Sequence, residues 1–237
     1  MDRTAIEKIA EMSAPNIIIE NGHSYTDKEL HVIPEPKTKT VTFHTLRGLV
    51  ETLKSEYEKF NAPMFVNVIN YNTVEVFETL NTSDRSREYP YQATSETMNF
   101  DFGRRQDYET MIIALKSKFV ETPELLNVVQ LLGNITNEQS AQTLDDGFTQ
   151  NVIVKKGIAL KENRNIKPIV KLKPYRTFLE VEQPESEFLL RLHDGDTVAL
   201  YEADGGAWKL TARTLIAEYL RKELAELIEA KNIVIVE

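Results

Sequence analysis

Cysteine is absent from this sequence of 237 residues. Disulfide bonds, thiol nucleophiles, thiolate-bound zinc and iron–sulfur clusters are therefore excluded. Long apolar runs are missing as well, and residues 1–15 are charged and amphipathic rather than continuously apolar. Because a membrane span needs about 20 apolar residues and a signal peptide needs an apolar centre, we expect a soluble protein of the cytoplasm.

Signature motifs of catalysis are lacking too. The nucleotide-binding patterns GxGxxG and GxxxxGK(S/T) do not occur, and neither do the hydrolase patterns GxSxG and HExxH. The four histidines, His23, His31, His44 and His193, do not have the spacing of a metal site. We predict no cofactor and no metal site, and catalysis is not favoured. A metal-dependent nuclease or hydrolase built from scattered carboxylates stays open as the weakest alternative.

Positive and negative charges are concentrated in two adjacent segments of a chain whose formal net charge is −9. Residues 154–176 contain eight Lys or Arg and one Glu, which gives +7, and residues 177–204 contain eight acids and one Arg, which gives −7. The basic segment either binds phosphates or pairs with the acidic segment that follows it. Under the first interpretation the candidate ligand-binding residues are Lys155, Lys156, Lys171, Lys173, Arg176 and Arg191.

The pairing interpretation is favoured by the pattern within residues 169–173. As a strand, this segment turns Val170 and Leu172 to the core and its two lysines to the opposite side. A proline flanks it at each end, and proline together with lysine is typical of an edge strand that is protected from pairing with other chains. We therefore predict an edge strand here, with a charge complement in the acidic segment.

Hydrophobic periodicity predicts an α+β fold with mixed and antiparallel sheets. An N-terminal α/β part is followed by two central helices, which begin at Asp107 and Thr122 and of which the second is predicted to stop at Gly133. A β-meander with a strand at 177–182 comes next, and then a long C-terminal helix and a short last strand. Two lobes are predicted, at residues 1–135 and 149–237, although one continuous domain would also fit.

Two glycines, Gly205 and Gly206, precede the final helix and lie next to the only tryptophan, Trp208. Consecutive glycines allow a sharp turn from a strand into a helix, and the tryptophan then anchors the helix on the sheet. Alternatively, the backbone N–H groups of the glycines hold an anion. The turn is the favoured role, and the backbone anion site is the weaker alternative.

The chain contains, in this order, the segments FGRRQDYETMIIALKSKF, DDGFTQNVIVKKG, KLKPYRTFLEVEQPESEFLLRL and ALYEADGGAWKL. Together they resemble the YfdQ-like family of prophage-associated proteins of unknown function. The resemblance covers about residues 30–225 and is most specific over residues 172–210. It implies a phage-encoded protein in the cytoplasm of a host bacterium, encoded near recombination or DNA-metabolism genes. It implies no reaction and no catalytic residues.

Two functions are predicted from these features. The first is a non-catalytic phage accessory protein that forms a homo-oligomer and sequesters a host protein or an anionic nucleotide, in counter-defence. The alternative is a DNA-metabolism or recombination factor that binds nucleic acid through residues 154–176. This alternative is weaker because single-strand binders interleave cations with several aromatic residues, whereas the segment contains only Tyr175. No membrane partner is expected.

Overall fold

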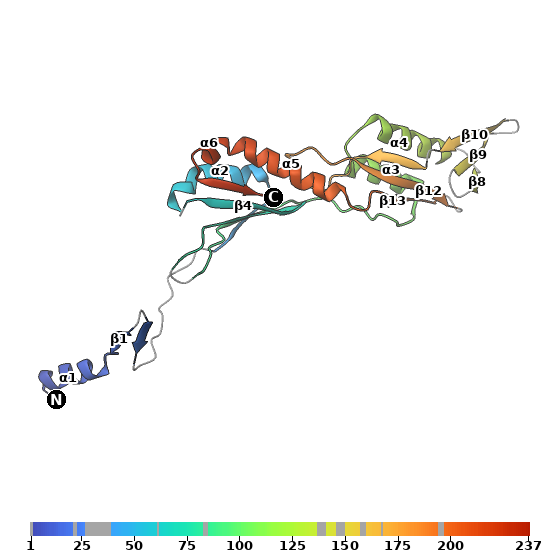
Figure 1. Cartoon of the computed structure of the whole chain (residues 1–237). Coiled ribbons are helices and arrows are strands. Elements are labelled where there is room, and N and C mark those ends of the chain that lie inside the picture. Colours follow the sequence, from blue (N-terminus) through green and yellow to red (C-terminus); the bar gives the residue numbers. More distant parts are fainter. Residues whose placement is uncertain are drawn as a thin grey trace. The chain divides into compact units, whose positions relative to one another are not determined.

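The computed structural model describes residues 2–20, 23–26, 39–60, 62–82, 85–136, 141–145, 150–156, 160–166, 168–193 and 197–237. The chain divides into two compact units, Met1–Lys37 and Thr38–Glu237 (Figure 1). Helices and strands occur in both units, and the sheets are mixed or antiparallel, which confirms the predicted α+β fold class. None of the helices in these ranges combines the length and the apolarity needed to cross a membrane.

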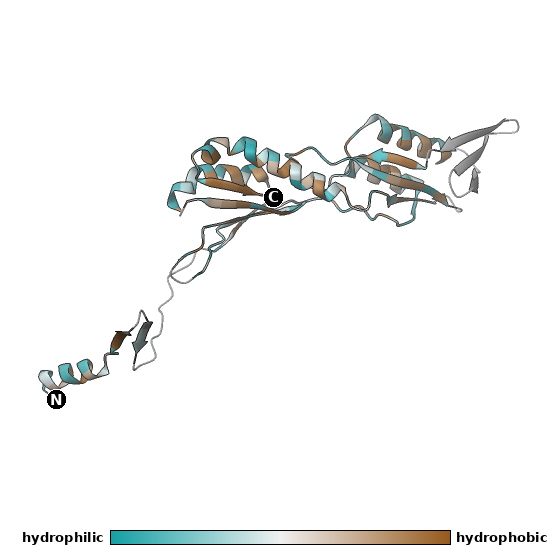
Figure 2. Cartoon of the chain, in the orientation of Figure 1, coloured by the Kyte–Doolittle hydropathy of each residue, from teal (hydrophilic) through white to brown (hydrophobic). Residues whose placement is uncertain are grey.

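The first unit contains one helix and one antiparallel hairpin. Its elements are α1 (Arg3–Ser13), β1 (Ile17–Glu20) and β2 (His23–Thr26). No residue of α1 is buried, and Ile6, Ile9 and Met12 are more than half exposed. Strand β1 is strongly hydrophobic (Figure 2). A helix of 11 residues and a two-stranded hairpin are each marginally stable alone, and the described residues give this unit no buried core.

A five-stranded sheet with helices packed on one face forms one part of the second unit. Its strands lie in the order β14-β4-β5-β6-β3, and the two outer pairs are parallel while the inner pairs are antiparallel. The strands are β3 (Val41–Phe43), β4 (Met64–Asn70), β5 (Thr73–Phe77), β6 (Tyr91–Thr94) and β14 (Ile233–Val236). The helices are α2 (Leu46–Glu56), the 3-10 helix η1 (Tyr57–Lys59), α5 (Trp208–Glu223) and α6 (Ala225–Glu229). Alternate strand residues and the apolar faces of α2 and α5 bury one another, and we call this cluster the α2–α5 core.

A four-stranded antiparallel sheet and two helices form another part of the same unit. Its strands, in the order β11-β12-β13-β7, are β11 (Ile169–Leu172), β12 (Ser186–His193), β13 (Thr197–Glu202) and β7 (Gln106–Asp107). The helices are α3 (Tyr108–Lys118) and α4 (Pro123–Thr136). Their buried side chains meet those of the sheet in a second cluster, the α3–α4 core. Strand β11 is at the edge of this sheet, as predicted.

Both central helices begin where the sequence predicts. The Asp107 side chain accepts a hydrogen bond from the N–H of Thr110 at 2.8 Å, and the Thr122 hydroxyl accepts one from the N–H of Leu125 at 3.1 Å. The predicted stop of α4 at Gly133 is wrong, because the helix continues to Thr136. A glycine inside a helix costs only about 1 kcal/mol, and continuing the helix keeps Ile135 in the α3–α4 core.

A third sheet is an antiparallel meander of three strands in the order β10-β9-β8. Its strands are β8 (Ala141–Asp145), β9 (Gln150–Lys156) and β10 (Leu160–Ile166).

Each of the two cores combines residues from both predicted lobes. The α2–α5 core joins residues between 46 and 93 to Phe178 and to residues between 216 and 233. The α3–α4 core joins residues between 108 and 135 to residues between 170 and 200. The last strand, β14, adds to β4 in parallel and so brings the C-terminal helices against α2. The predicted boundary between 1–135 and 149–237 falls in residues that are described only in part, and it stays a prediction.

Residues 177–182 form bends and a turn, so the strand predicted there is wrong. Phe178 is buried in the α2–α5 core, whereas Leu179 is 70% exposed. The side-chain oxygen of Gln183 accepts hydrogen bonds from the N–H groups of Arg176 and Thr177 at 2.9 and 3.2 Å, and the Thr177 hydroxyl donates to the Tyr71 carbonyl at 2.5 Å. These partners satisfy polar groups of the segment without a neighbouring strand.

Candidate functional site

The lysines of the predicted basic strand are paired with carboxylates. Lys171 lies opposite Glu187 in the β11–β12 register, and their Nζ and Oε1 atoms are 3.7 Å apart. Lys173 Nζ lies 2.5 Å from Glu182 Oε1, and this hydrogen bond raises the pKa of Lys173. Burial alternates along β11 as predicted, with Val170 and Leu172 inside. The geometry of the strand therefore supports the edge-strand interpretation, with its charge complement in the acidic segment.

Arg176 is buried, with 8% of its surface exposed. Its guanidinium lies 3.8 Å above the centre of the Trp208 ring and 5.6 Å from that of Phe188. It donates to Glu202 at 2.9 Å and also to the Ser186 hydroxyl. Burial lowers the pKa of Arg176 to about 10, which leaves it cationic at neutral pH. The cation is therefore enclosed by its own chain.

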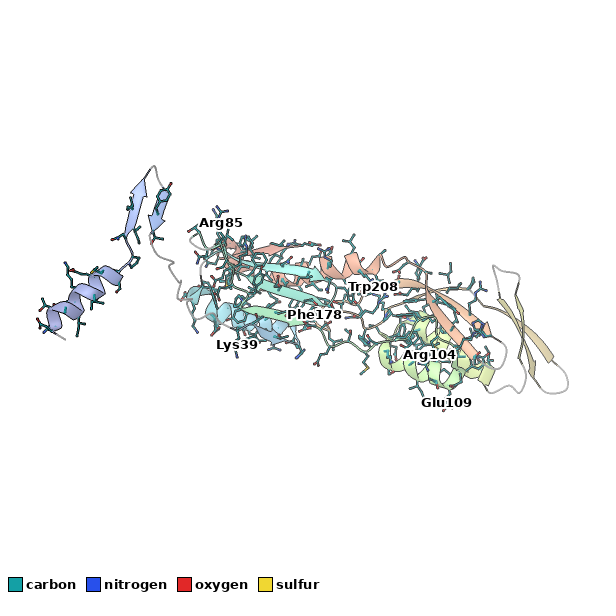
Figure 3. All side chains as sticks on the ribbon, turned by 90° about the horizontal axis from the view of Figure 1, so that it is seen from below. Lys39, Arg85, Arg104, Glu109, Phe178 and Trp208 are labelled. Atoms are coloured by element: carbon teal, nitrogen blue, oxygen red, sulfur yellow. The ribbon has the colours of Figure 1, made fainter. Side chains whose placement is uncertain are left out.

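The ring under this guanidinium belongs to Trp208, the first residue of α5. Figure 3 labels Trp208 together with the buried Phe178. It also meets Tyr71, in the turn between β4 and β5, with the ring centres 4.8 Å apart. Because Phe188 belongs to the α3–α4 core and the β4–β5 turn to the other sheet, Arg176 and Trp208 join the two parts of the unit.

The remaining predicted cations are not gathered with these three. Lys155 and Lys156 lie in β9, whose backbone pairing is described but whose side chains fall outside the described part of the chain. Arg191 lies on β12 opposite Ala199 of β13. No single surface brings the predicted ligand-binding residues together among those that the structure describes.

The two glycines before α5 form a turn that only glycine adopts easily. Gly205 and Gly206 have φ angles of 62° and 82°. The Gly206 N–H donates to Asp204 Oδ1 at 3.0 Å, so a carboxylate of the chain itself occupies the place that was predicted for an anion. Burial alone would raise the pKa of Asp204, but backbone N–H groups of Gly206 and Trp208, the Ser186 hydroxyl and the Arg176 charge lower it overall.

Replacing Asp204 with Asn should lower the free energy of unfolding at pH 7 by about 1 kcal/mol, because the amide keeps an acceptor for the Gly206 N–H but loses the charge that attracts Arg176. A carboxylate whose pKa is lowered on folding stabilises the protein fully above its ordinary pKa of about 3.9, and this contribution is lost as the pH falls below that value. Denaturant titrations at pH 7 and pH 3 should therefore show the wild type and the variant converging in acid. A difference that is equal at both pH values would contradict the charge-based role.

A groove of about 550 Å³ lies beside α3, and we call it the α3 groove. Its wall is built by the loop of residues 100–105, which a hydrogen bond from the Gly103 N–H to the Leu200 carbonyl, 2.8 Å long, ties to β13. Gly103 has a φ of 79°, which allows the tight turn. The next residues pair with β13 as strand β7. This arrangement places Arg104 and Arg105 beside the first turn of α3 (Figure 3, where Arg104 and Glu109 are labelled).

The charges around the α3 groove are not balanced. Arg104 pairs with Asp101 at 3.3 Å, and Lys118 donates to the uncharged carbonyl of Asn99 at 2.6 Å. Asp107 is ionised, because hydrogen bonds from the backbone and the hydroxyl of Thr110 lower its pKa, so the lining holds three cations and two carboxylates. For Arg105, the described residues provide no hydrogen bond or ion pair. The groove therefore has cationic charge in excess of what its own carboxylates neutralise.

The cations of this groove do not form a run in the sequence, so they were not predicted as a site. Arg104 and Arg105 lie outside the basic segment, and Lys118 is separated from them by the whole length of α3. The available signal was a glycine followed by two arginines, two residues before the helix cap Asp107. Within the described ranges, no group of three or more histidines and carboxylates is placed to hold a metal ion.

Comparison of the chain with family models, with curated protein sequences and with solved structures finds no match. The resemblance to the YfdQ-like family stays a prediction. The structure itself defines an α+β protein whose larger unit has two hydrophobic cores and carries a cationic groove beside one of them.

Proposed function

We propose that this protein works by binding a small anionic ligand in the α3 groove, without catalysing a reaction. The observation that carries the proposal is the net positive charge of the groove lining, which contains Arg104, Arg105 and Lys118 against Asp101 and Asp107. An arginine guanidinium binds phosphate or carboxylate oxygens in a bidentate manner. Occupation by an anion would therefore supply the hydrogen bonds that Arg105 does not make within the described part of the chain.

The resemblance to prophage proteins supplies a setting for this proposal. In a phage-infected bacterium, a binding protein of this kind would withdraw an anionic molecule, or a host protein, from a defence pathway, and it would do so as a homo-oligomer. Nucleic-acid binding through the basic segment is not favoured, because Lys171, Lys173 and Arg176 each contact a carboxylate of the same chain.

Replacing Arg105 with Gln should weaken anion binding by about 10- to 100-fold, because a charge-assisted hydrogen bond contributes about 1.5–3 kcal/mol. Calorimetric titration of the full chain with phosphate and with pyrophosphate at low salt measures the affinity. Arg105 is exposed and has no hydrogen bond or ion pair with the described residues, so the melting temperature without ligand should be unchanged.

The matched control is Lys116→Gln, which removes one positive charge from the same helix at an exposed residue outside the groove lining. The control should bind like the wild type. Equal losses in both variants would indicate a general charge effect rather than a site, and the absence of saturable binding to the wild type would refute the proposal.

A further inference from the structure

The α3 groove has an apolar wall in addition to its cations. Ile113 lies on α3 outside the buried face of the helix and is 61% exposed, although Met111 and Leu115 on either side of it are buried completely. Phe100 also lines the groove, and its ring is fixed by an edge contact with Phe119, with the centroids 5.1 Å apart. Apolar surface beside uncompensated cations suits a ligand with one charged end and one apolar end.

Uncharged polar groups complete the lining. Gln106 and Ser117 both line the groove, and an amide side chain offers donors and an acceptor at one position. The Ser117 hydroxyl donates to the Ala114 carbonyl at 3.3 Å, so its lone pairs remain able to accept a hydrogen bond from a ligand. Ala114 also lines the groove.

We propose that the ligand of the α3 groove is a nucleotide, with its phosphate at Arg105 and its base against Phe100 and Ile113. This inference rests on the anion-binding function proposed above and adds the chemical class of the ligand. A phosphate accepts hydrogen bonds from the guanidinium, and a planar base stacks on an aromatic and apolar wall. The edge of the base can hydrogen-bond to the amide and the hydroxyl. The volume of about 550 Å³ lies within the usual range of small-molecule sites, roughly 300–1,000 Å³.

The helix terminus is not the binding element. The first N–H groups of α3 face Asp107, whose carboxylate accepts from the Thr110 N–H at 2.8 Å and from its hydroxyl at 2.7 Å. An incoming phosphate would have to displace this cap. The inference therefore depends on side chains, namely Arg105 for the charge and Ile113 with Phe100 for the base.

The test compares three ligands, of which the second adds a sugar to the phosphate and the third adds a base to the sugar phosphate. Calorimetric titrations of the full chain would use inorganic phosphate, ribose 5-phosphate and the nucleoside 5′-monophosphates. We expect at least one nucleotide to bind about tenfold tighter than ribose 5-phosphate or more, the scale of one base stacked on an apolar surface. Ile113→Ser should reduce this advantage severalfold and leave the affinity for inorganic phosphate unchanged.

Two further variants make the outcome specific. Leu210→Ser replaces an equally exposed leucine on α5, 67% exposed and outside the groove lining, and it should change no affinity. Arg105→Gln should weaken all three ligands by the same factor. Equal affinity for phosphate, ribose 5-phosphate and every nucleotide would overturn the nucleotide inference while leaving anion binding intact. Failure of all three to bind would overturn anion binding as well.

Discussion

Replacing Phe178 with alanine is expected to lower the free energy of unfolding by about 3–5 kcal/mol, the usual cost of removing a buried phenyl ring. The ring is buried in the α2–α5 core, together with residues of both helices and of the sheet. The backbone around it is fixed, because the Thr177 hydroxyl donates to the Tyr71 carbonyl and the Gln183 amide bonds the Thr177 N–H and the Phe178 carbonyl. The segment therefore cannot move easily into the cavity that the substitution leaves. Urea titration monitored by circular dichroism measures the loss.

The adjacent residue is the control for this prediction. Leu179→Ala should change the free energy of unfolding by no more than about 0.5 kcal/mol, because the Leu179 side chain is 70% exposed. If residues 177–182 formed a strand, Phe178 and Leu179 would face opposite sides of one sheet. Comparable losses in the two variants would show that Leu179 is buried in solution and would contradict the turn.

Replacing Arg176 with alanine is expected to cost about 3 kcal/mol, at the lower end of the range for removing one member of a buried ion pair. The lower end applies because Glu202, which would lose its partner, is partly exposed and can be hydrated. The substitution also removes the cation above the Trp208 ring and the donor to Ser186. Denaturant titration at neutral pH is the measurement.

Two comparisons separate the causes of this loss. Lys173→Ala removes a neighbouring cation from an exposed pair with Glu182, and it should cost less than about 1 kcal/mol. Arg176→Lys keeps the charge but loses the planar group that stacks on Trp208 and bonds two partners at once, so it should remain clearly less stable than the wild type. If lysine restores full stability, charge alone accounts for the contribution of Arg176.

Much of the architecture follows from local sequence pattern. The helix starts at Asp107 and Thr122 are set by side chains that accept hydrogen bonds three residues away. Strand β11 shows the alternation that its two apolar residues predict, and Lys171 lies beside Glu187 because β11 pairs with the next strand, β12. These features were predictable because each depends on residues close in sequence.

The candidate site and the misassigned segment depend instead on distant residues. Residues 177–182 have the composition of a strand, but the Tyr71 carbonyl, 106 positions away, and the amide of Gln183 hold them in a turn. The α3 groove exists because residues 106–107 pair with β13, about 90 positions further along the chain.

The sequence by itself determined the α+β class, the helix starts and the edge strand with its charge complement. The tertiary structure alone decided that Arg176 is enclosed while Arg105 has no partner in the described residues. Arg105 stands between Arg104 and Gln106 and Arg176 between Tyr175 and Thr177, and these neighbours do not indicate which arginine is buried. The difference arises because the Arg176 guanidinium meets Trp208 and Glu202, whereas the turn at Gly103 leaves Arg105 lining an open groove.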